Sequence, residues 1–184
     1  LKPLLRLAED GYKFGLQISV VSLEIIHSID KSILPKIIKL VDDGRIEIIG
    51  NGYSQIIQPL IPWEVNLKNQ MLGIDGYLEM LKTAPKIATI NEMAFSSEST
   101  RSYADAGYET ILMEWNNAYK NNQSWNKNYK YFLAKICFHN SQRIKVMWGD
   151  SIAFQKFQRY VHGEISLEKY ISWLEKSTRN APKS

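Results

Sequence analysis

Short apolar runs alternate along the chain with longer segments in which apolar residues recur every three or four positions. The short runs predict strands and the longer segments predict helices, because side chains alternate in direction along a strand and repeat every 3.6 residues along a helix. Strands are predicted at residues 12–21, 45–50, 86–90, 108–114 and 143–148. Helices are predicted at residues 2–10, from Asp30 or Ser32 to about 43, and at 63–83, 99–106, 151–161 and 166–177.

Three segments have a less definite pattern. Residues 22–27 either extend the first strand or begin a short helix, and residues 131–138 form either a strand or an apolar loop. Residues 118–128 are rich in Asn, Lys, Tyr and Trp without a clear period, which predicts an extended surface loop.

The alternation of strand and helix predicts an α/β fold, with a parallel sheet or barrel covered by helices. About five strands are visible, too few for a closed barrel. The first residue is Leu1 rather than Met, and the chain opens in what reads as the last turns of a helix. We therefore expect a single domain, residues 1–184, that is part of a longer protein and lacks an N-terminal strand.

Composition narrows the function classes. The formal charge of +4 is spread along the chain without a block of one sign, so we expect no nucleic-acid partner. No apolar run approaches the length of a membrane span, and we expect no membrane partner. The single cysteine, Cys137, excludes an internal disulfide and is typical of a cytoplasmic protein. His27 and His139 stand alone, so neither a metal site nor another cofactor is expected.

Glu92 is the main candidate for chemistry, because it follows the predicted strand 86–90 directly. In parallel α/β folds the catalytic groups gather at the carboxyl ends of the strands and in the loops after them. Polar and aromatic residues lie at or just after the ends of the predicted strands: Asn51, Tyr53, Gln55, Asn91, Glu114, Trp115, Asn116, Trp148 and Asp150. Amides and carboxylates bind hydroxyl groups, and aromatic faces stack on sugar rings. The set therefore predicts a carbohydrate site, with Asn91, Asn116 and Trp148 among the candidate substrate contacts.

Glu92 and Asp150 could supply the two carboxyl groups that glycoside cleavage needs. A retaining mechanism places such groups about 5 Å apart and an inverting mechanism about 6.5–9.5 Å apart. Asp150 has an alternative role, because Asp-Ser before Ile152 is a plausible helix cap. Glu114, in contrast, is interpreted as a solvated charge at a strand end.

Four blocks of the sequence resemble successive motifs of glycoside hydrolase family 57. They are GRIEIIGNGYSQIIQPL at 44–60, INEMAFS at 90–96, AGYETILMEWNN at 106–117 and WGDSIAFQKFQRYVHGE at 148–164. The family contains α-amylases, 4-α-glucanotransferases, branching enzymes and amylopullulanases on an incomplete (β/α)7 barrel. The resemblance implies this fold, an α-glucan or oligosaccharide substrate, Glu92 as the nucleophile and Asp150 as the general acid/base. It also implies that Tyr53, Gln55 and Trp115 contact the substrate.

The chain departs from the family pattern at three places. No counterpart of the family's first, histidine-containing motif is present, Gln55 stands where many members have histidine, and Gly149 replaces an arginine. These departures leave a second hypothesis open, a non-catalytic glucan-binding domain on the same fold. A metal-dependent polysaccharide deacetylase would need an Asp-His-His set that the sequence does not contain.

Overall fold

The computed structural model describes residues 1–137, 143–179 and 181. Its helices are α1 (Lys2–Glu9), α2 (Val20–Ile29), α3 (Ile33–Asp42), α4 (Trp63–Leu81), α5 (Ser97–Asp105), α6 (Trp115–Asn121), α7 (Ser151–Val161) and α8 (Leu167–Thr178), with 3-10 turns η1 (Gln58–Leu60), η2 (Asn91–Met93) and η3 (Lys127–Tyr131). Its strands are β1 (Phe14–Gln17), β2 (Ile46–Gly50), β3 (Ile87–Thr89), β4 (Thr110–Glu114), β5 (Ala134–Cys137) and β6 (Arg143–Gly149).

The strands form one mostly parallel sheet in the order β1-β2-β3-β4-β6-β5. Strand β2 pairs in parallel with β1, where Leu16 lies opposite Ile48, and with β3, where Gly50 lies opposite Ala88. The predicted α/β class with a parallel sheet is therefore confirmed, with six strands in the described chain instead of about five. The chain divides into two compact units, Leu1–Ile111 with Ile136–Ile144, and Leu112–Lys135 with Lys145–Ser184. A single barrel domain over residues 1–184 stays a prediction.

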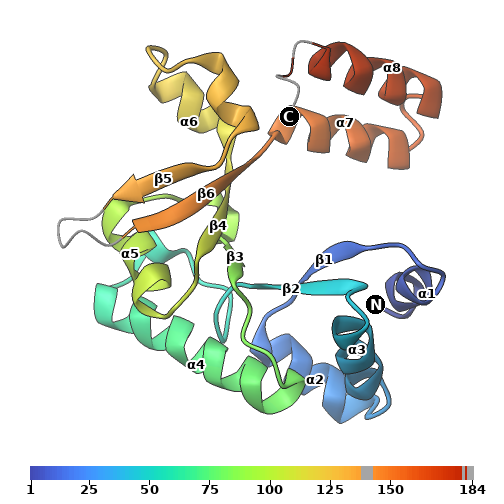
Figure 1. Ribbon diagram of the computed structural model, residues 1–184, viewed down its shortest axis with the longest axis vertical. Coiled ribbons are helices and arrows are strands. Elements are labelled where there is room, and N and C mark those ends of the chain that lie inside the picture. Colours follow the sequence, from blue (N-terminus) through green and yellow to red (C-terminus); the bar gives the residue numbers. More distant parts are fainter. Residues whose placement is uncertain (138–142, 180, 182–184) are drawn as a thin grey trace. The chain divides into compact units, whose positions relative to one another are not determined.

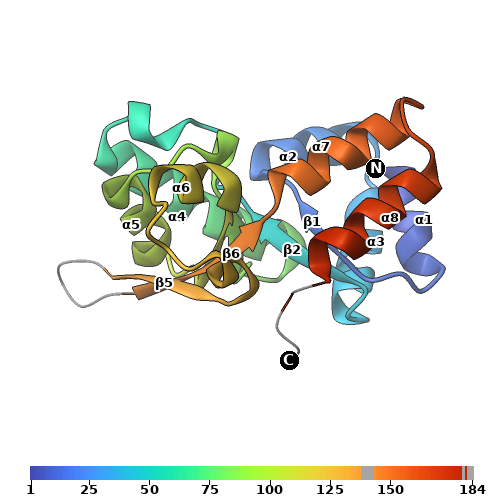
Figure 2. The same cartoon turned by 90° about the horizontal axis from the view of Figure 1, so that it is seen from above.

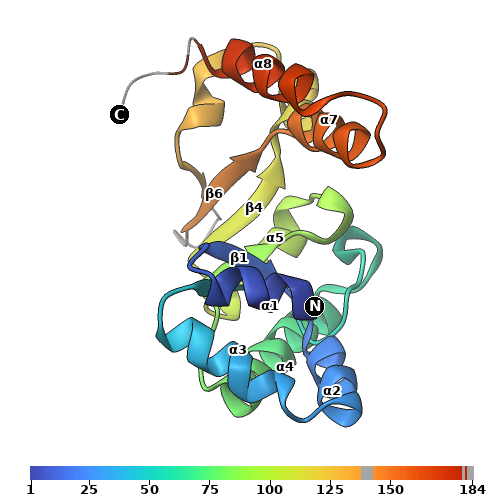
Figure 3. The same cartoon turned by 90° about the vertical axis from the view of Figure 1, so that its right-hand side faces the viewer.

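The core of the first unit lies between its strands and the helices α1 to α4. Helices α2, α3 and α4 lie together on one side of β1 and β2 (Figures 1 and 3). The fully buried side chains there include Leu23 from α2, Ile37 from α3 and Tyr77 from α4. In the second unit, α7 and α8 run side by side (Figure 2), and the rings of Tyr160 and Tyr170 stack between them at 6.2 Å.

Two predictions from the hydrophobic pattern were wrong. The first strand ends at Gln17 instead of residue 21, because Ser19 caps α2 by accepting a hydrogen bond from the Ser22 N–H at 3.4 Å. Residues 118–128 are not an extended loop, because α6 covers the first of them and η3 begins at Lys127. Residues 131–138 contain β5 at Ala134–Cys137, and residue 138 lies outside the described residues.

The end of α4 has a left-handed backbone at a residue with a side chain. Lys82 has φ 60° and ψ 17°, a conformation that costs about 1–2 kcal/mol for a residue other than glycine. Glycine removes this steric cost but loses about 0.4–1 kcal/mol more in conformational entropy on folding. The net effect of Lys82→Gly is therefore expected to be a rise in the free energy of unfolding of about 0.5–1 kcal/mol. Urea unfolding measures the change. Lys82→Ala, which keeps the unfavourable conformation, should give no such gain, and a loss in Lys82→Gly would contradict the prediction.

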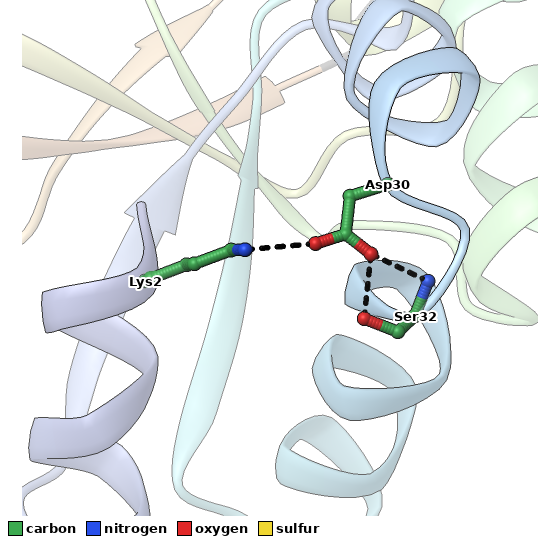
Figure 4. A network of polar contacts seen from close by, with 3 residues as sticks. All are labelled: Lys2, Asp30 and Ser32. Atoms are coloured by element: carbon green, nitrogen blue, oxygen red, sulfur yellow. Dashed lines mark hydrogen bonds and ion pairs between the residues drawn. The ribbon is translucent and has the colours of Figure 1, made fainter.

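A small polar network links α1 to the start of α3 (Figure 4). Asp30 Oδ1 accepts hydrogen bonds from the Ser32 hydroxyl at 2.6 Å and the Ser32 N–H at 3.0 Å, and Asp30 Oδ2 pairs with Lys2 Nζ at 2.9 Å. The hydrogen bonds from Ser32 and the charge of Lys2 lower the pKa of Asp30 from 3.8 to about 2.

Asp30 is expected to stabilise the fold in a pH-dependent way. Its pKa is lower in the folded chain than in the unfolded chain, so its contribution is complete above about pH 4 and is lost as the pH falls toward 2. We expect Asp30→Asn to lower the melting temperature at pH 7 and to match the unsubstituted chain at pH 2. Thermal melts between pH 2 and 7 test this, with Asp42→Asn on an exposed position as the control. Parallel melting curves for Asp30→Asn and the unsubstituted chain would contradict the prediction.

Candidate functional site

Glu92 lies in a left-handed turn at the carboxyl end of β3. Glu92 has φ 53° and Met93 has φ 52°, and both residues are exposed. Two backbone hydrogen bonds hold the turn, from the Met93 N–H to the Ile90 oxygen and from the Ala94 N–H to the Asn91 oxygen, each 3.1 Å long. Each left-handed residue costs about 1–2 kcal/mol. Strain of this kind is concentrated at functional sites, where the surrounding structure imposes it.

Asn91 connects this turn to the loop that follows β2. Its side chain is buried, and its Nδ2 donates a hydrogen bond to the backbone oxygen of Ile56 at 3.2 Å. The same loop carries Gln55, which is exposed, and Tyr53, whose hydroxyl donates to Glu24 Oε2 at 2.9 Å. The hydrogen bond to the Glu24 carboxylate raises the pKa of Tyr53 above its usual value. The first unit thus joins Tyr53, Gln55, Asn91 and Glu92 on two linked loops.

Two buried tyrosines support the strand ends beneath these loops. The Tyr77 hydroxyl donates to the backbone oxygen of Ile18 and accepts from the Asn51 N–H at 3.3 Å. The Tyr103 hydroxyl donates to the backbone oxygen of Thr89, three residues before Glu92, at 3.3 Å. Burial raises the pKa of Tyr77 to about 12 and raises the pKa of Tyr103 above the usual range. Both hydroxyls therefore remain protonated donors that fix the strand ends at neutral pH.

The second unit contains a cluster of four aromatic rings. The Trp115 ring centre lies 5.3 Å from those of Trp148 and Tyr119, and 6.1 Å from that of Trp125. Trp115 is only 5% exposed, whereas the other three rings are partly exposed. Trp115 is therefore placed to support the other rings rather than to offer its own face to a ligand.

Asp150 caps α7, as its alternative interpretation predicted. Its Oδ1 accepts hydrogen bonds from the Ile152 N–H at 2.9 Å and the Ala153 N–H at 3.2 Å. No hydrogen bond to Asp150 Oδ2 is present among the described residues. The cap uses Oδ1 and leaves Oδ2 for a contact with a ligand. A catalytic role for Asp150 therefore stays a prediction.

Side chains from the end of β4 hold the start of α7 from the other side. Asn116 Oδ1 accepts from the Ser151 N–H at 3.1 Å, and the Ser151 hydroxyl donates to Glu114 Oε1 at 2.6 Å. Glu114 Oε2 also caps α6 by accepting from the Asn117 N–H at 2.7 Å. Glu114 lies partly exposed at the end of β4, as interpreted, but both of its carboxylate oxygens accept hydrogen bonds that hold the two helix starts. Asn116, Trp115, Trp148 and Asp150 all belong to this second unit.

The sequence analysis gave Glu114 no role in this arrangement and did not single out Tyr119, Trp125 and Ser151. Tyr119 and Trp125 lie in the segment that was predicted to be a loop. The sequence did contain a signal for two of these residues. Tyr119 follows Trp115 at the helical spacing of four, and Glu114 precedes Asn117 at the spacing of an N-terminal cap.

No group of three or more His, Cys, Asp and Glu side chains close enough to hold a metal ion occurs among the described residues. His27 is exposed, and His139 lies outside the described part of the chain. No helix in the described residues is both long enough and apolar enough to cross a membrane.

The chain is similar in structure to several sugar-active enzymes. It superposes on a 4-α-glucanotransferase from Thermococcus litoralis with a TM-score of 0.78 and 21% identity, over 98% of this chain and 27% of that one. It superposes on an α-amylase from Thermotoga maritima with a TM-score of 0.56 and 17% identity, over 71% of this chain and 25% of that one. It superposes on an α-mannosidase from Enterococcus faecalis with a TM-score of 0.58 and 15% identity, over 80% of this chain and 16% of that one. The chain thus spans about a quarter or less of the length of these proteins.

The comparison of sequences is more specific about the protein family than the comparison of structures. Among curated proteins, no sequence matches this chain. Residues 5–184, nearly the whole chain, match the sequence profile of glycosyl hydrolase family 57. The similarity in fold to the glucanotransferase agrees with this match. The chain therefore belongs to glycosyl hydrolase family 57.

Proposed function

We propose that the protein cleaves or transfers the glycosidic bonds of α-glucans, with amylose, maltooligosaccharides and glycogen-like polymers as substrates and Glu92 as the nucleophile. The observation that supports this most strongly is the conformation of Glu92. An exposed carboxylate on a strained turn at the carboxyl end of a parallel strand, in a glycosyl hydrolase family, supports a role as the nucleophile. The structural neighbours include a 4-α-glucanotransferase and an α-amylase, which act in the proposed substrate class.

The proposed reaction retains the configuration at the sugar carbon. A Glu92 carboxylate oxygen attacks the anomeric carbon while the bond to the leaving oxygen breaks, and an acid donates a proton to that oxygen. Water or a sugar hydroxyl then attacks the glycosyl-enzyme and gives its proton to the same acid/base group. Asp150 is the candidate for this group, and its Oδ2 would carry the proton because Oδ1 accepts two N–H bonds in the cap.

The test is the reaction of the natural full-length protein with maltoheptaose, followed by proton NMR of the reducing ends as they form. We expect new products whose anomeric configuration is first α and then equilibrates. Products that appear first in the β configuration would indicate an inverting enzyme and would exclude a glycosyl-enzyme at Glu92.

A second candidate function is glucan binding without turnover on the same fold. The engagement of Asp150 in a helix cap favours it, because a cleaving enzyme needs an acid/base group in addition to its nucleophile. Binding of maltoheptaose that is measurable by calorimetry, with no product after prolonged incubation, would support this function against the enzymatic one.

A further inference from the structure

A pocket outside the candidate site opens in the first unit between η1 and the starts of α4 and α5. Its volume is about 280 Å³. Gln58, Trp63 and Asn66 line it from η1 and α4, and Glu64 and Glu98 line it from the first turns of α4 and α5. Pro59 and Pro62 add apolar surface.

Several hydrogen-bonding groups in the lining have no partner among the described residues. Gln58 is only 1% exposed, yet neither its Oε1 nor its Nε2 makes a hydrogen bond. The same holds for Asn66 Oδ1 and for Trp63 Nε1. Asn66 Nδ2 donates to the backbone oxygens of Gln58 at 2.9 Å and Ile61 at 3.0 Å, which fixes the orientation of that amide. Because native proteins satisfy nearly all of their buried polar groups, these atoms point to a bound molecule or to bound water.

The unpartnered groups include both donors and acceptors. Trp63 Nε1 and Gln58 Nε2 donate, whereas Gln58 Oε1 and Asn66 Oδ1 accept. A hydroxyl group both donates and accepts, so a ligand with several hydroxyls matches this mixture. Each of these atoms has less than 1 Å² of accessible surface, so a ligand in the pocket would reach them only as the lining side chains turn toward it.

The charges around the pocket disfavour an anionic ligand. Glu64 and Glu98 are both exposed and carry negative charge. The Arg101 guanidinium lies 5.4 Å from the centre of the Trp63 ring and pairs with Asp105 at 3.2 Å, so that carboxylate already compensates its charge. The part of the chain that the structure describes places no third metal ligand beside these two glutamates. A neutral ring with hydroxyl edges and apolar faces, which would contact Trp63 and the prolines, fits this lining.

The two loops of the candidate site lead into this pocket. Gln58 follows Gln55 by three residues, so their Cα atoms are at most about 11 Å apart. Glu98 follows Glu92 by six residues, so the Cα atoms of these two glutamates are at most about 22 Å apart. An oligosaccharide of several units spans such distances.

We infer that the pocket is a distal subsite that binds one sugar unit of an α-glucan chain whose other end lies at Glu92. The inference rests on the proposed function, since it specifies a substrate of several units. It assigns Trp63 as a platform for a sugar ring and Glu98 as an acceptor for its hydroxyls.

The test compares a short and a long substrate in the natural full-length protein. Trp63→Ala is expected to raise the KM for maltoheptaose about tenfold and Glu98→Ala several-fold, while kcat/KM for maltotriose changes much less, because a chain of three units has fewer units to place in a distal subsite. Glu79→Ala, at an exposed position on α4 away from the pocket, is the matched control and should change neither substrate. Circular dichroism checks the fold of each variant. Equal losses on both substrates, or no change on maltoheptaose, would overturn the inference.

The failure of this inference can be told apart from failure of the proposed function. If the unsubstituted protein turns over neither substrate, calorimetric binding of maltoheptaose replaces the kinetics. A Kd about tenfold weaker in Trp63→Ala than in the Glu79→Ala control would support the subsite even though the catalytic proposal had failed. A Kd that is unchanged in both Trp63→Ala and Glu98→Ala would overturn the subsite, whatever the outcome for catalysis.

Discussion

Glu92→Gln is expected to lower kcat on maltoheptaose by at least about a thousandfold in the natural full-length protein. The amide is nearly the same size as the carboxylate but cannot attack an anomeric carbon, so no glycosyl-enzyme forms. The side chain is exposed and has no hydrogen bond or ion pair among the described residues, so the free energy of unfolding should change by less than about 0.5 kcal/mol. Initial rates and urea unfolding measure the two quantities.

Two further variants separate a nucleophile from a residue that only supports the site. Glu92→Ala with added azide should form a glycosyl azide, because the small anion enters the space of the missing carboxylate and attacks the same carbon. Glu109→Gln, at another exposed glutamate of the same unit, should keep activity near that of the unsubstituted protein. If Glu92→Gln retained more than a tenth of the activity, another group would have to be the nucleophile.

Gly73→Ala is expected to lower the free energy of unfolding by about 1–3 kcal/mol. A Cβ at this position of α4 would lie 2.6 Å from the carbonyl carbon and 2.7 Å from the Cα of Gly52, and 2.9 Å from the Tyr53 nitrogen. These are backbone atoms, which no side-chain rotation can move. The higher helix propensity of alanine, about 1 kcal/mol, offsets only part of the clash. Denaturant unfolding, read by circular dichroism, measures the loss.

The neighbouring residues of α4 supply graded controls for this prediction. A Cβ at Gly76 would meet the Val20 side chain, with Cγ1 at 2.5 Å, so Gly76→Ala should cost less than Gly73→Ala because a side chain can move more easily than backbone. Asp75→Ala, on the exposed face, should change the free energy of unfolding by less than about 0.5 kcal/mol. Gly73→Ala should also weaken the proposed substrate contacts of Tyr53 and Gln55, because the loop that carries them packs on this glycine. An equal free energy of unfolding for Gly73→Ala, Gly76→Ala and Asp75→Ala would contradict the close packing of Gly73 on the backbone of Gly52 and Tyr53.

The sequence predicted the elements with strong end signals most accurately. Helix α7 was predicted with both of its observed ends, because Asp150 caps its start and Gly163 follows its end. Strand β2 was predicted to within one residue, since a glycine precedes it and an uninterrupted apolar run forms it. Val20 and Val21 misled the prediction of the first strand, because the β-branched residues favour strands locally whereas the Ser19 cap and the core contacts of Val20 favour the helix.

The buried face of α4 could not be predicted from hydrophobicity. The residues that face inward are Asn66, Gln70, Gly73, Tyr77 and Leu81, at helical spacing but mostly polar or small. Val65, Met71, Leu72 and Leu78 are exposed on the same helix. A pattern of apolar positions assigns such a helix the wrong face, since the polar groups become buried only through the tertiary packing of the loop after β2.

The sequence predicted that two loops of the candidate site meet, but it did not predict the directions of their side chains. The rule that parallel strands present their carboxyl ends together places Asn91 and Glu92 beside the loop of Tyr53 and Gln55, and the Asn91 hydrogen bond to Ile56 confirms that the two loops meet. Side-chain directions do not follow from that rule. The inward orientation of Asn91 and the left-handed backbone of Glu92 depend on contacts between residues far apart in the sequence.

The turn at Glu92 and Met93 has a consequence for laboratory evolution of this protein. Glycine adopts the left-handed conformation without steric cost, so selection for thermal tolerance alone would favour glycine at Met93, whose side chain is 44% exposed and contributes little packing. Glycine would also let the turn sample other conformations and would release the carboxylate next to it. We therefore expect heat-tolerant lineages that acquire glycine there to become catalytically poorer, which makes this turn a position to hold constant in any library built for stability.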